Sequence, residues 1–279
     1  MKFKTRFAPS PTGPLHLGHA YSALLAHSAA RTRAGQFHLR MDDIDQSRAR
    51  AEWALQIQDD LRWLGVTWDG PIWSQHARSA HYILALERLW AKGLLYSCSC
   101  TRADIKAAAN APQEGAPLIG PDGVIYPGSC RCDPEGVMPK HAALRLNMKK
   151  SLQLFDIKHI SFSESNQNYT KTALEMIAQI GDVVLSRKDM AASYHLSIVC
   201  DDADQGITHV IRGEDLREAT FIHILLQRLL GYPTPKYRHH RLIREENGKR
   251  LAKRDDARAI AAYRIEGRTP LDIRQMIGL

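Results

Sequence analysis

The sequence contains no apolar run near the roughly 20 residues that a membrane-spanning helix needs, which argues against an integral membrane protein. The N-terminus carries basic residues without the hydrophobic core of a secretory signal, so we expect a cytoplasmic protein. Internal repeats and low-complexity linkers are absent as well. Cysteine is scarce, with five residues, and without an export signal their arrangement favours metal binding over disulfides.

The composition is that of a soluble globular protein, with 44% apolar and 24% charged residues. A chain of 279 residues can bury a full core in one large domain or two ordinary ones. Thirty-eight basic residues against 30 acidic ones give a net charge of +8 and a pI near 9.3. This excess is compatible with a polyanionic partner, although many basic proteins bind no nucleic acid.

The N-terminal segment RFAPSPTGPLHLGH, residues 6–19, combines a basic residue, a proline-rich turn and an H-x-G-H pattern. Its prolines fix backbone angles and remove donors, so the next helix is expected over about 18–34. His16 and His19 then lie at a helix N-terminus, where free N–H groups and the helix dipole attract anions. Gly18 allows a ligand to approach the backbone closely. Taken alone, the pattern is also compatible with an ordinary turn before a helix.

Strand-like and helix-like runs alternate along most of the chain, which predicts an α/β fold with a parallel sheet and crossover helices. The expected strand QFHLRM ends in the acidic cluster Asp42, Asp43 and Asp45. Ligands of open parallel sheets bind at the carboxyl ends of strands, so this cluster is expected beside the two histidines. Alternatively, the carboxylates cap the next helix, predicted over about 47–64. We expect one of them to contact substrate and the others to cap or to pair with arginine.

In the second half of the chain, AALRLNM, SLQLFDI and DVVLSR are predicted strands, and SFSESNQNYTK a polar stretch before a helix. The strand ITHVIRG is expected before a helix over 217–230. A last strand is predicted over 238–243. Two short helices are predicted after it, over 258–265 and 270–277.

Four of the cysteines form two C-x-C pairs, Cys98 with Cys100 and Cys130 with Cys132. The loop between the pairs is too poor in apolar residues to build its own core, so a tetrahedral metal clip would order it. Zinc with two ligands from each pair is the natural hypothesis from the chemistry, and four unligated thiols are the alternative. Such a zinc would be structural, because no position stays open for catalysis. Cys200 is most simply a small buried apolar residue.

A second basic motif, KRLAKRD, follows the last predicted strand and a polar, glycine-containing loop. On its own, a run of this kind is usually a solvated basic loop. Its place after the last strand, far along the chain from the H-x-G-H pattern, favours a functional role instead.

Together these motifs resemble those of the class I aminoacyl-tRNA synthetases. The string A-P-S-P-T-G-x-L-H-x-G-H is similar to their nucleotide-binding signature in the glutamyl- and glutaminyl-specific enzymes, and KRLAKR resembles their K-M-S-K-S loop. The resemblance implies a Rossmann-like parallel-sheet catalytic domain over 1–255, with a zinc-clipped insertion at about 95–135. A short helical tail over 256–279 is expected after it, without an anticodon-binding domain.

The resemblance also implies the reaction, in which L-glutamate and ATP with Mg²⁺ give an aminoacyl-adenylate and pyrophosphate. The family's ATP-binding positions correspond to His16, Gly18, His19 and Lys253, of which the histidines and the lysine are implied to be catalytic. Donors at a helix N-terminus would stabilise charge on phosphate oxygens, and Lys253 would neutralise the leaving pyrophosphate. Ala252 departs from the family's usual serine, so this loop loses a hydroxyl contact.

The family's glutamate-contacting positions correspond to Arg6, Ala8, Ser10, Asp42, Tyr194 and Arg212. The resemblance also implies that Tyr194 lies at the turn into a helix. Glutamate carries two carboxylates and one ammonium group. Its binding site therefore needs arginines that can each donate two hydrogen bonds to a carboxylate, roles given to Arg6 and Arg212, and an anion near the ammonium group, a role given to Asp42. The family usually has glutamate at the position of Asp42. The shorter carboxylate would lengthen the contact with the amine, bridge it by water or leave it to Asp43.

For the metal, the resemblance implies two cysteines of C-x-C followed by Y-x-x-x-C. In this sequence the implied ligands are Cys98, Cys100, Tyr126 and Cys130, and Cys132 is the rival fourth ligand.

The chain covers only the catalytic half of a glutamyl-tRNA synthetase, which implies a shortened branch of that family. In that branch, glutamate is activated without tRNA and transferred to queuosine at the wobble position of tRNA(Asp). A monomer is expected. The alternatives are a truncated enzyme that charges tRNA(Glu), a tRNA-binding paralogue without catalysis, and an unrelated H-x-G-H nucleotidyltransferase. The last of these would not need Arg6, Arg212 or the cysteine clip.

Overall fold

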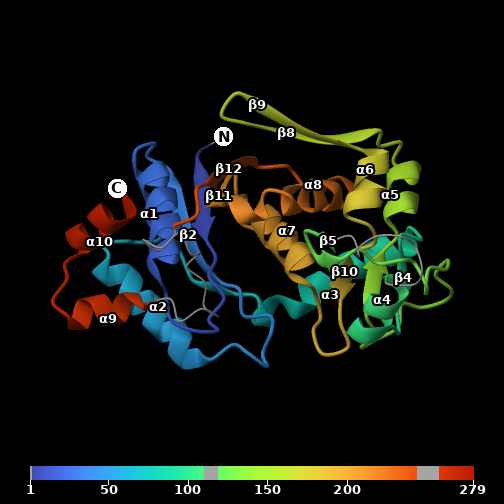
Figure 1. Ribbon diagram of the computed structural model, residues 1–279, viewed down its shortest axis with the longest axis horizontal. Helices are drawn as coiled ribbons and strands as arrows, with labels where there is room; N and C mark the ends of the chain where they lie inside the picture. Colours follow the sequence, from blue (N-terminus) through green and yellow to red (C-terminus); the bar gives the residue numbers. More distant parts are fainter. Residues whose placement is uncertain (1, 110–118, 244–257) are drawn as a thin grey trace. The chain divides into compact units, whose positions relative to one another are not determined.

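The computed structural model describes residues 2–109, 119–243 and 258–279 (Figure 1). The chain divides into two compact units, each assembled from separate stretches of sequence. The first unit comprises residues 1–77, 206–215 and 235–279. The second unit comprises residues 78–205 and 216–234.

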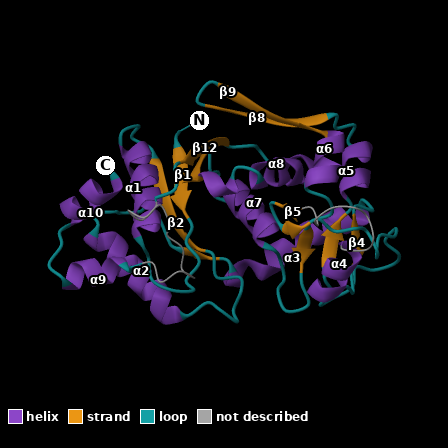
Figure 2. Cartoon of the chain, in the orientation of Figure 1, coloured by secondary structure: helices purple, strands orange, loops and turns teal. Residues whose placement is uncertain are grey.

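The strands in the described residues of the first unit pair in parallel, in agreement with the predicted parallel sheet (Figure 2). They are β1 (Lys4–Phe7), β2 (Gln36–Met41), β3 (Trp73–Ser74), β11 (His209–Gly213) and β12 (Lys236–His240). β1 pairs with β2, β2 with β3, and β11 with β12. β11 lies beside β1, where the Thr208 N–H donates to the Lys4 carbonyl at 3.0 Å. The strands then lie in the order β3-β2-β1-β11-β12. From β1 the chain adds β2 and β3 on one side, and it later adds β11 and β12 on the other side. Ligands of such sheets bind at the carboxyl ends of the strands next to this reversal, between β1 and β11.

Helices of the first unit bury an apolar core against these strands. They are α1 (Leu17–Arg31), α2 (Ala51–Trp63), α9 (Ile260–Ile265) and α10 (Pro270–Ile277). Small side chains let α1 approach the strands closely, and the fully buried ones are Ala20, Ala23, Ala26 and Ala30. α10 packs on α1 through Ile273 and Ile277, which are 0% and 1% exposed. The two short helices predicted near the C-terminus are therefore confirmed.

The second unit combines helices with three small antiparallel sheets. Its helices are α3 (Ser79–Ala91), α4 (Arg102–Ala109), α5 (Met148–Leu154), α6 (Ala173–Gln179), α7 (Tyr194–Asp204) and α8 (Ala219–Leu230). Its strands are β4 (Leu95–Ser97), β5 (Ile119–Gly120), β6 (Gly123–Val124), β7 (Leu144–Leu146), β8 (His159–Glu164), β9 (Gln167–Thr172) and β10 (Val184–Ser186). Two short 3-10 helices are η1 (His76–Arg78) and η2 (Glu214–Leu216). Cys200 on α7 is 1% exposed, which confirms it as a buried residue.

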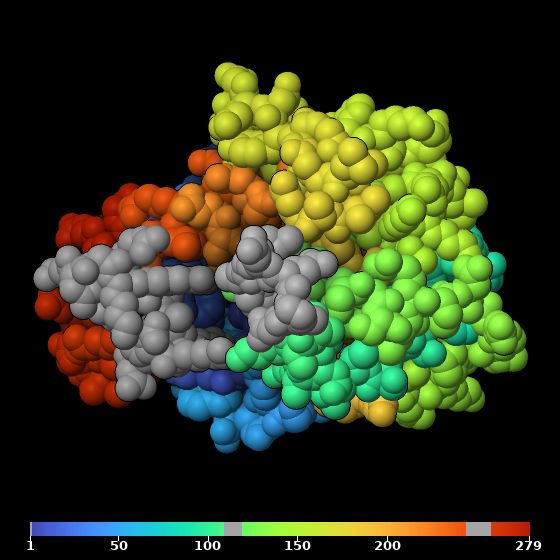
Figure 3. Space-filling view, turned by 45° about the vertical axis from the view of Figure 1, so that its right-hand side comes forward, coloured from blue at the N-terminus to red at the C-terminus, as the bar shows by residue number. Residues whose placement is uncertain are grey.

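One predicted strand of this unit was wrong, and one hairpin was not predicted. The first half of the segment SLQLFDI, predicted as a strand, lies in α5, whose start is capped by Asn147 accepting from the Lys150 N–H at 3.0 Å. Its buried residues Met148, Ser151 and Leu152 follow helical spacing. The polar stretch before α6 is the hairpin β8–β9, which lies at the surface (Figure 3).

Across the described part of the chain, no helix has both the length and the apolar character of a membrane span.

Candidate functional site

The two histidines of the H-x-G-H pattern cap the start of α1, as predicted. Nδ1 of His16 accepts from the Gly18 N–H at 3.1 Å, and Nδ1 of His19 accepts from the His16 N–H at 3.2 Å. This is a reciprocal capping box in which two imidazoles take the places of hydroxyl and carboxylate. Because each Nδ1 accepts, a neutral ring carries its proton on Nε2. The helix start therefore presents N–H groups of both backbone and imidazole type.

Gly18 is required by the packing of this capping box. A Cβ at this position would lie 3.0 Å from Cε1 and 3.1 Å from Nδ1 of His16. The His16 ring also lies over the His19 ring, with 3.8 Å between centroids. A side chain at Gly18 would therefore push the His16 ring away from the helix start.

A backbone hydrogen bond connects the segments that follow β1 and β2, close in sequence to this helix start. Arg6 on β1 is 4% exposed, and Ala8 and Ser10 follow the strand. The Asp42 N–H donates to the Pro9 carbonyl at 3.0 Å. The predicted acidic residue of β2 therefore lies next to the predicted glutamate-binding segment.

The Asp42 carboxylate forms an ion pair with a fully buried arginine. Its Oδ1 accepts from Nε of Arg40 at 3.0 Å, and the Arg40 side chain is 0% exposed. The acidic cluster does not cap α2, which begins at Ala51 without a side-chain cap. Asp43 instead accepts from the Ser74 hydroxyl at 2.7 Å and from the backbone of η1. The alternative of helix capping was wrong. Asp45 pairs with Arg48 at 3.8 Å, as expected of the aspartates not assigned to substrate, and Asp42, the one assigned to substrate, pairs with arginine as well.

Arg212 is a further buried arginine near the change in strand order. It lies on β11, is 5% exposed, and its Nε donates to Nε2 of His239 at 3.3 Å. Its guanidinium carbon lies 5.2 Å from the centroid of the Tyr237 ring. The adjacent strands β1 and β11 thus each carry a buried guanidinium, a group suited to bidentate contact with a carboxylate.

Tyr194 is the first residue of α7 in the second unit, as predicted. Its ring contacts the imidazoles of His195 and His223, at centroid distances of 5.5 and 5.7 Å. Sequence reasoning missed both histidines. His195 follows the tyrosine directly, whereas His223 lies in a helix that carried no signal of this contact.

Lys253 and Ala252 lie outside the described residues, so the role assigned to this loop stays a prediction.

Three cysteines and a tyrosine converge in the second unit. The Sγ atoms of Cys98, Cys100 and Cys130 lie within 4.8 Å of one another. The Tyr126 hydroxyl lies 3.4 Å from Sγ of Cys98 and of Cys100, and it accepts from the Cys130 N–H at 2.8 Å. Cys132 is exposed and lies outside this group. The structure therefore brings Tyr126, and not Cys132, to the three thiols.

The dimensions of this cluster fit a tetrahedral zinc ion. Zinc–sulfur bonds of about 2.3 Å and zinc–oxygen bonds of about 2.0 Å imply edges of about 3.8 Å between sulfurs and about 3.5 Å from sulfur to oxygen. Here the Cys100 and Cys130 sulfurs are 3.3 Å apart, and the sulfur–oxygen distances are 3.4 Å. Hydrogen bonding to the Tyr126 hydroxyl lowers the pKa of the Cys130 thiol to about 6, which favours the thiolate that binds metals.

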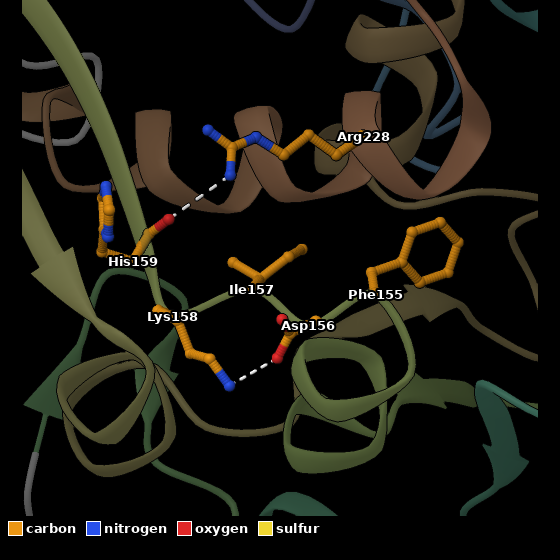
Figure 4. A pocket seen from close by; sticks show the side chains of 6 residues that line it. All are labelled: Phe155, Asp156, Ile157, Lys158, His159 and Arg228. Carbon is orange, nitrogen blue, oxygen red and sulfur yellow. Dashed lines mark hydrogen bonds and ion pairs between the residues drawn. The ribbon is translucent and has the colours of Figure 1, made fainter.

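A cavity of about 310 Å³ lies elsewhere in the second unit (Figure 4). Its lining residues are Phe155, Asp156, Ile157, Lys158, His159 and Arg228. Arg228 donates to the His159 carbonyl at 3.3 Å, and Lys158 pairs with Asp156. None of the predicted site residues lines this cavity.

Comparison with known proteins agrees with this geometry. The family of class I tRNA synthetases (E and Q), catalytic domain, matches residues 2–279. The chain belongs to this family of class I tRNA synthetases. It is a ligase of the synthetase type, with the α/β catalytic fold of the class.

Two relatives that share one name match nearly the whole of this chain. A glutamyl-Q tRNA(Asp) synthetase of Rhodobacter capsulatus is 58% identical over 280 residues, which are 99% of each protein. A glutamyl-Q tRNA(Asp) synthetase of Symbiobacterium thermophilum is 40% identical and is matched over 82% of its length.

Among solved structures, a glutamate tRNA ligase of Elizabethkingia meningosepticum in complex with its amino acid has a TM-score of 0.73 and 27% identity. The match covers 92% of this chain but 53% of that ligase, so the synthetase chain spans about half of its length.

Proposed function

We propose that the chain activates L-glutamate with ATP in the absence of tRNA and transfers it to queuosine at the wobble position of tRNA(Asp). The observation that carries this proposal is the 58% identity to a glutamyl-Q tRNA(Asp) synthetase over 99% of both chains. The buried arginines and the donor-rich start of α1 support it, because the substrates are a dicarboxylate and a triphosphate.

In the proposed activation step, a carboxylate oxygen of glutamate attacks the α-phosphorus of ATP. The bond from that phosphorus to the bridging oxygen breaks, and pyrophosphate leaves. The Nε2–H groups of His16 and His19 would donate to phosphate oxygens as negative charge develops. Lys253 would neutralise the leaving pyrophosphate, and Mg²⁺ bound with ATP would supply further positive charge there.

Glutamate recognition is proposed to rest on charge. Arg6 and Arg212 would hold the carboxylates, with the hydroxyls of Ser10 and Tyr194 as further contacts. Asp42 would accept from the ammonium group while it shares its carboxylate with Arg40.

In the proposed transfer step, a hydroxyl of the cyclopentene-diol of queuosine attacks the activated carbonyl of the glutamyl-adenylate, and AMP leaves. Unstacked bases of an anticodon loop suit a basic protein as a partner.

We further propose that Cys98, Cys100, Tyr126 and Cys130 bind one structural Zn²⁺. The ion would hold the insertion at about 95–135 in place, with all four positions taken by protein ligands. The catalytic domain is proposed to extend over 1–255, with residues 256–279 as its helical tail.

Glutamate-dependent exchange of pyrophosphate into ATP tests the activation step. We expect exchange without tRNA in the wild type. His19→Ala and Lys253→Ala should each lower the rate at least about a hundredfold, because each removes a donor or charge at the reacting phosphates. His27→Ala is the matched control, since His27 lies farther along the same helix, bonded to Thr67 and Arg31. Wild-type rates in both site variants would refute the assignment.

Transfer of labelled glutamate identifies the acceptor. Label should appear on tRNA(Asp) that carries queuosine and should be absent from tRNA(Asp) with unmodified guanosine. Charging of tRNA(Glu) with exchange that depends on that tRNA would indicate a truncated glutamyl-tRNA synthetase. Absence of exchange under all conditions would indicate a tRNA-binding protein without catalysis.

A further inference from the structure

Two buried histidines and a carboxylate form a hydrogen-bonded chain in the second unit. Nδ1 of His195 on α7 lies 3.1 Å from Nε2 of His223 on α8. Nε2 of His195 lies 3.5 Å from Oδ1 of Asp122, in the turn between β5 and β6. His195 is 6% exposed and His223 is 1% exposed. None of the roles assigned so far uses these three side chains.

The carboxylate fixes the proton positions along this chain. Burial raises the pKa of the Asp122 carboxyl, but the hydrogen bond and the charge of His195, with smaller contributions from Val184 and Arg187, together outweigh this effect, so the pKa is lowered and the group is ionised. A carboxylate only accepts, so Nε2 of His195 carries a proton. A neutral His195 then has its lone pair on Nδ1, and Nε2 of His223 must donate to it. One surface carboxylate therefore sets the tautomers of two buried rings.

Both rings support Tyr194. The Tyr194 ring meets His195 at an interplanar angle of 63° and His223 at 67°, in edge-to-face contacts. The two imidazole centroids are 5.3 Å apart. A tyrosine at the start of a helix thus contacts two rings that are joined to each other by a hydrogen bond.

We propose that His223, His195 and Asp122 are positioning residues that set the orientation of Tyr194 for glutamate binding. The inference rests on the proposed function, in which the Tyr194 hydroxyl contacts glutamate. Asp122 lies in the insertion at about 95–135, so this segment contributes to amino acid recognition as well as to the metal cluster.

Two substitutions at His223 separate positioning from simple packing. A glutamine places its amide where Nε2 lies, whereas an asparagine places it where Nδ1 lies. In tRNA-independent pyrophosphate exchange, we expect His223→Asn to raise the KM for glutamate about tenfold, with the KM for ATP within about twofold of wild type. His223→Gln keeps the hydrogen bond to His195, so its KM values for glutamate and for ATP should both stay within about threefold of wild type.

Asp122→Ala is the second variant, since the Asp122 side chain is 36% exposed and tolerates substitution better than a buried histidine. We expect it to raise the KM for glutamate about threefold without changing the KM for ATP. His81→Gln, at a 56% exposed side chain of the same unit, is the control and should match wild type.

An unchanged KM for glutamate in both His223→Asn and Asp122→Ala would overturn the proposal. A parallel rise of both KM values would overturn it as well, because it would indicate a general loss of structure. Failure of the proposed function is distinguishable, since the wild type itself would then show no glutamate-dependent exchange.

Discussion

Tyr126 is the proposed fourth ligand of the cysteine cluster. Its hydroxyl lies at equal distances of 3.4 Å from two thiols, and its ring stacks under the Arg145 guanidinium at 3.9 Å. This stacking holds the ring in place, because Arg145 is itself bonded to the Asp182 carbonyl at 2.9 Å. The hydroxyl is therefore fixed before any ion binds.

Tyr126→Phe should weaken zinc binding about tenfold or more, because it removes one oxygen ligand and leaves the three thiols. Competition with a chromophoric chelator measures the affinity. Cys132→Ser is the matched control and should keep the wild-type affinity, since Cys132 is exposed and lies outside the cluster. Loss of zinc in Cys132→Ser with retention in Tyr126→Phe would assign the fourth ligand to Cys132.

Residue types and spacing predicted a metal clip with two ligands from each C-x-C pair, and only the family resemblance pointed to Tyr126 in place of Cys132. That choice depends on a backbone turn. Gly128 has a φ of 94°, and the Arg131 N–H donates to its carbonyl at 2.9 Å. The turn brings Cys130 into the cluster and leaves Cys132 exposed. A positive φ at one glycine was not predictable from the spacing of the cysteines.

The Arg40–Asp42 pair was predictable in part. Side chains two apart in a strand point to the same face, so R-x-D at the end of β2 was a usable signal for an ion pair. The contact between His195 and His223 had no such signal, because α7 and α8 are separate in sequence and meet only through tertiary packing.

Among the elements, α1 is anchored at its end by one carboxylate. Oδ2 of Asp69 accepts from Nη1 of Arg31, the last residue of α1, at 2.9 Å and from the Phe37 N–H in β2 at 2.8 Å. Burial raises the pKa of the Asp69 carboxyl, but the hydrogen bonds from Phe37 and Arg31 outweigh it and lower the pKa below the usual 3.8. The link between helix and strand therefore depends on an ionised aspartate.

Asp69→Asn should lower the free energy of unfolding at pH 7 by less than about 1 kcal/mol, because the pair is partly exposed. A folded-state pKa below the unfolded value gives stability that is present above pH 3.8 and is lost as pH falls through the folded-state pKa. The difference between variant and wild type should thus shrink at pH 3. Urea unfolding at pH 7, 5 and 3 measures it, and a difference that grows toward pH 3 would contradict the assignment.

Most helices and the longer parallel strands were predictable because their apolar spacing agrees with their burial, whereas the two-residue strand β3 was not predicted. The hairpin β8–β9 was missed because its outward residues are polar and mask the alternation of buried Ile160, Phe162 and Glu164. Its two-residue turn, Ser165–Asn166, has φ values of 48° and 66° without a glycine. The usual sequence signal of such a turn was therefore absent.

For the molecule as a whole, the net charge of +8 predicts how the two half-reactions respond to salt. Binding of tRNA releases counterions, so the KM for tRNA(Asp) should rise at least about tenfold between 50 and 200 mM KCl. Pyrophosphate exchange without tRNA should change about twofold or less over this range, because its substrates are small. Equal salt sensitivity of both reactions would contradict an electrostatic tRNA interface.

The division of the first unit into three stretches of sequence has a consequence for the order of folding. The Lys4 N–H on β1 donates a hydrogen bond to the Thr208 hydroxyl, 204 residues later, and the Ile260 N–H donates to the Leu15 carbonyl. The β4–β7 pairing of the second unit joins Leu95 to Leu146, a much shorter separation. Closing the longer loop costs more chain entropy, so the second unit should acquire its structure first during synthesis. The start of α1 would then gain its last backbone contacts only after Ile260 has left the ribosome.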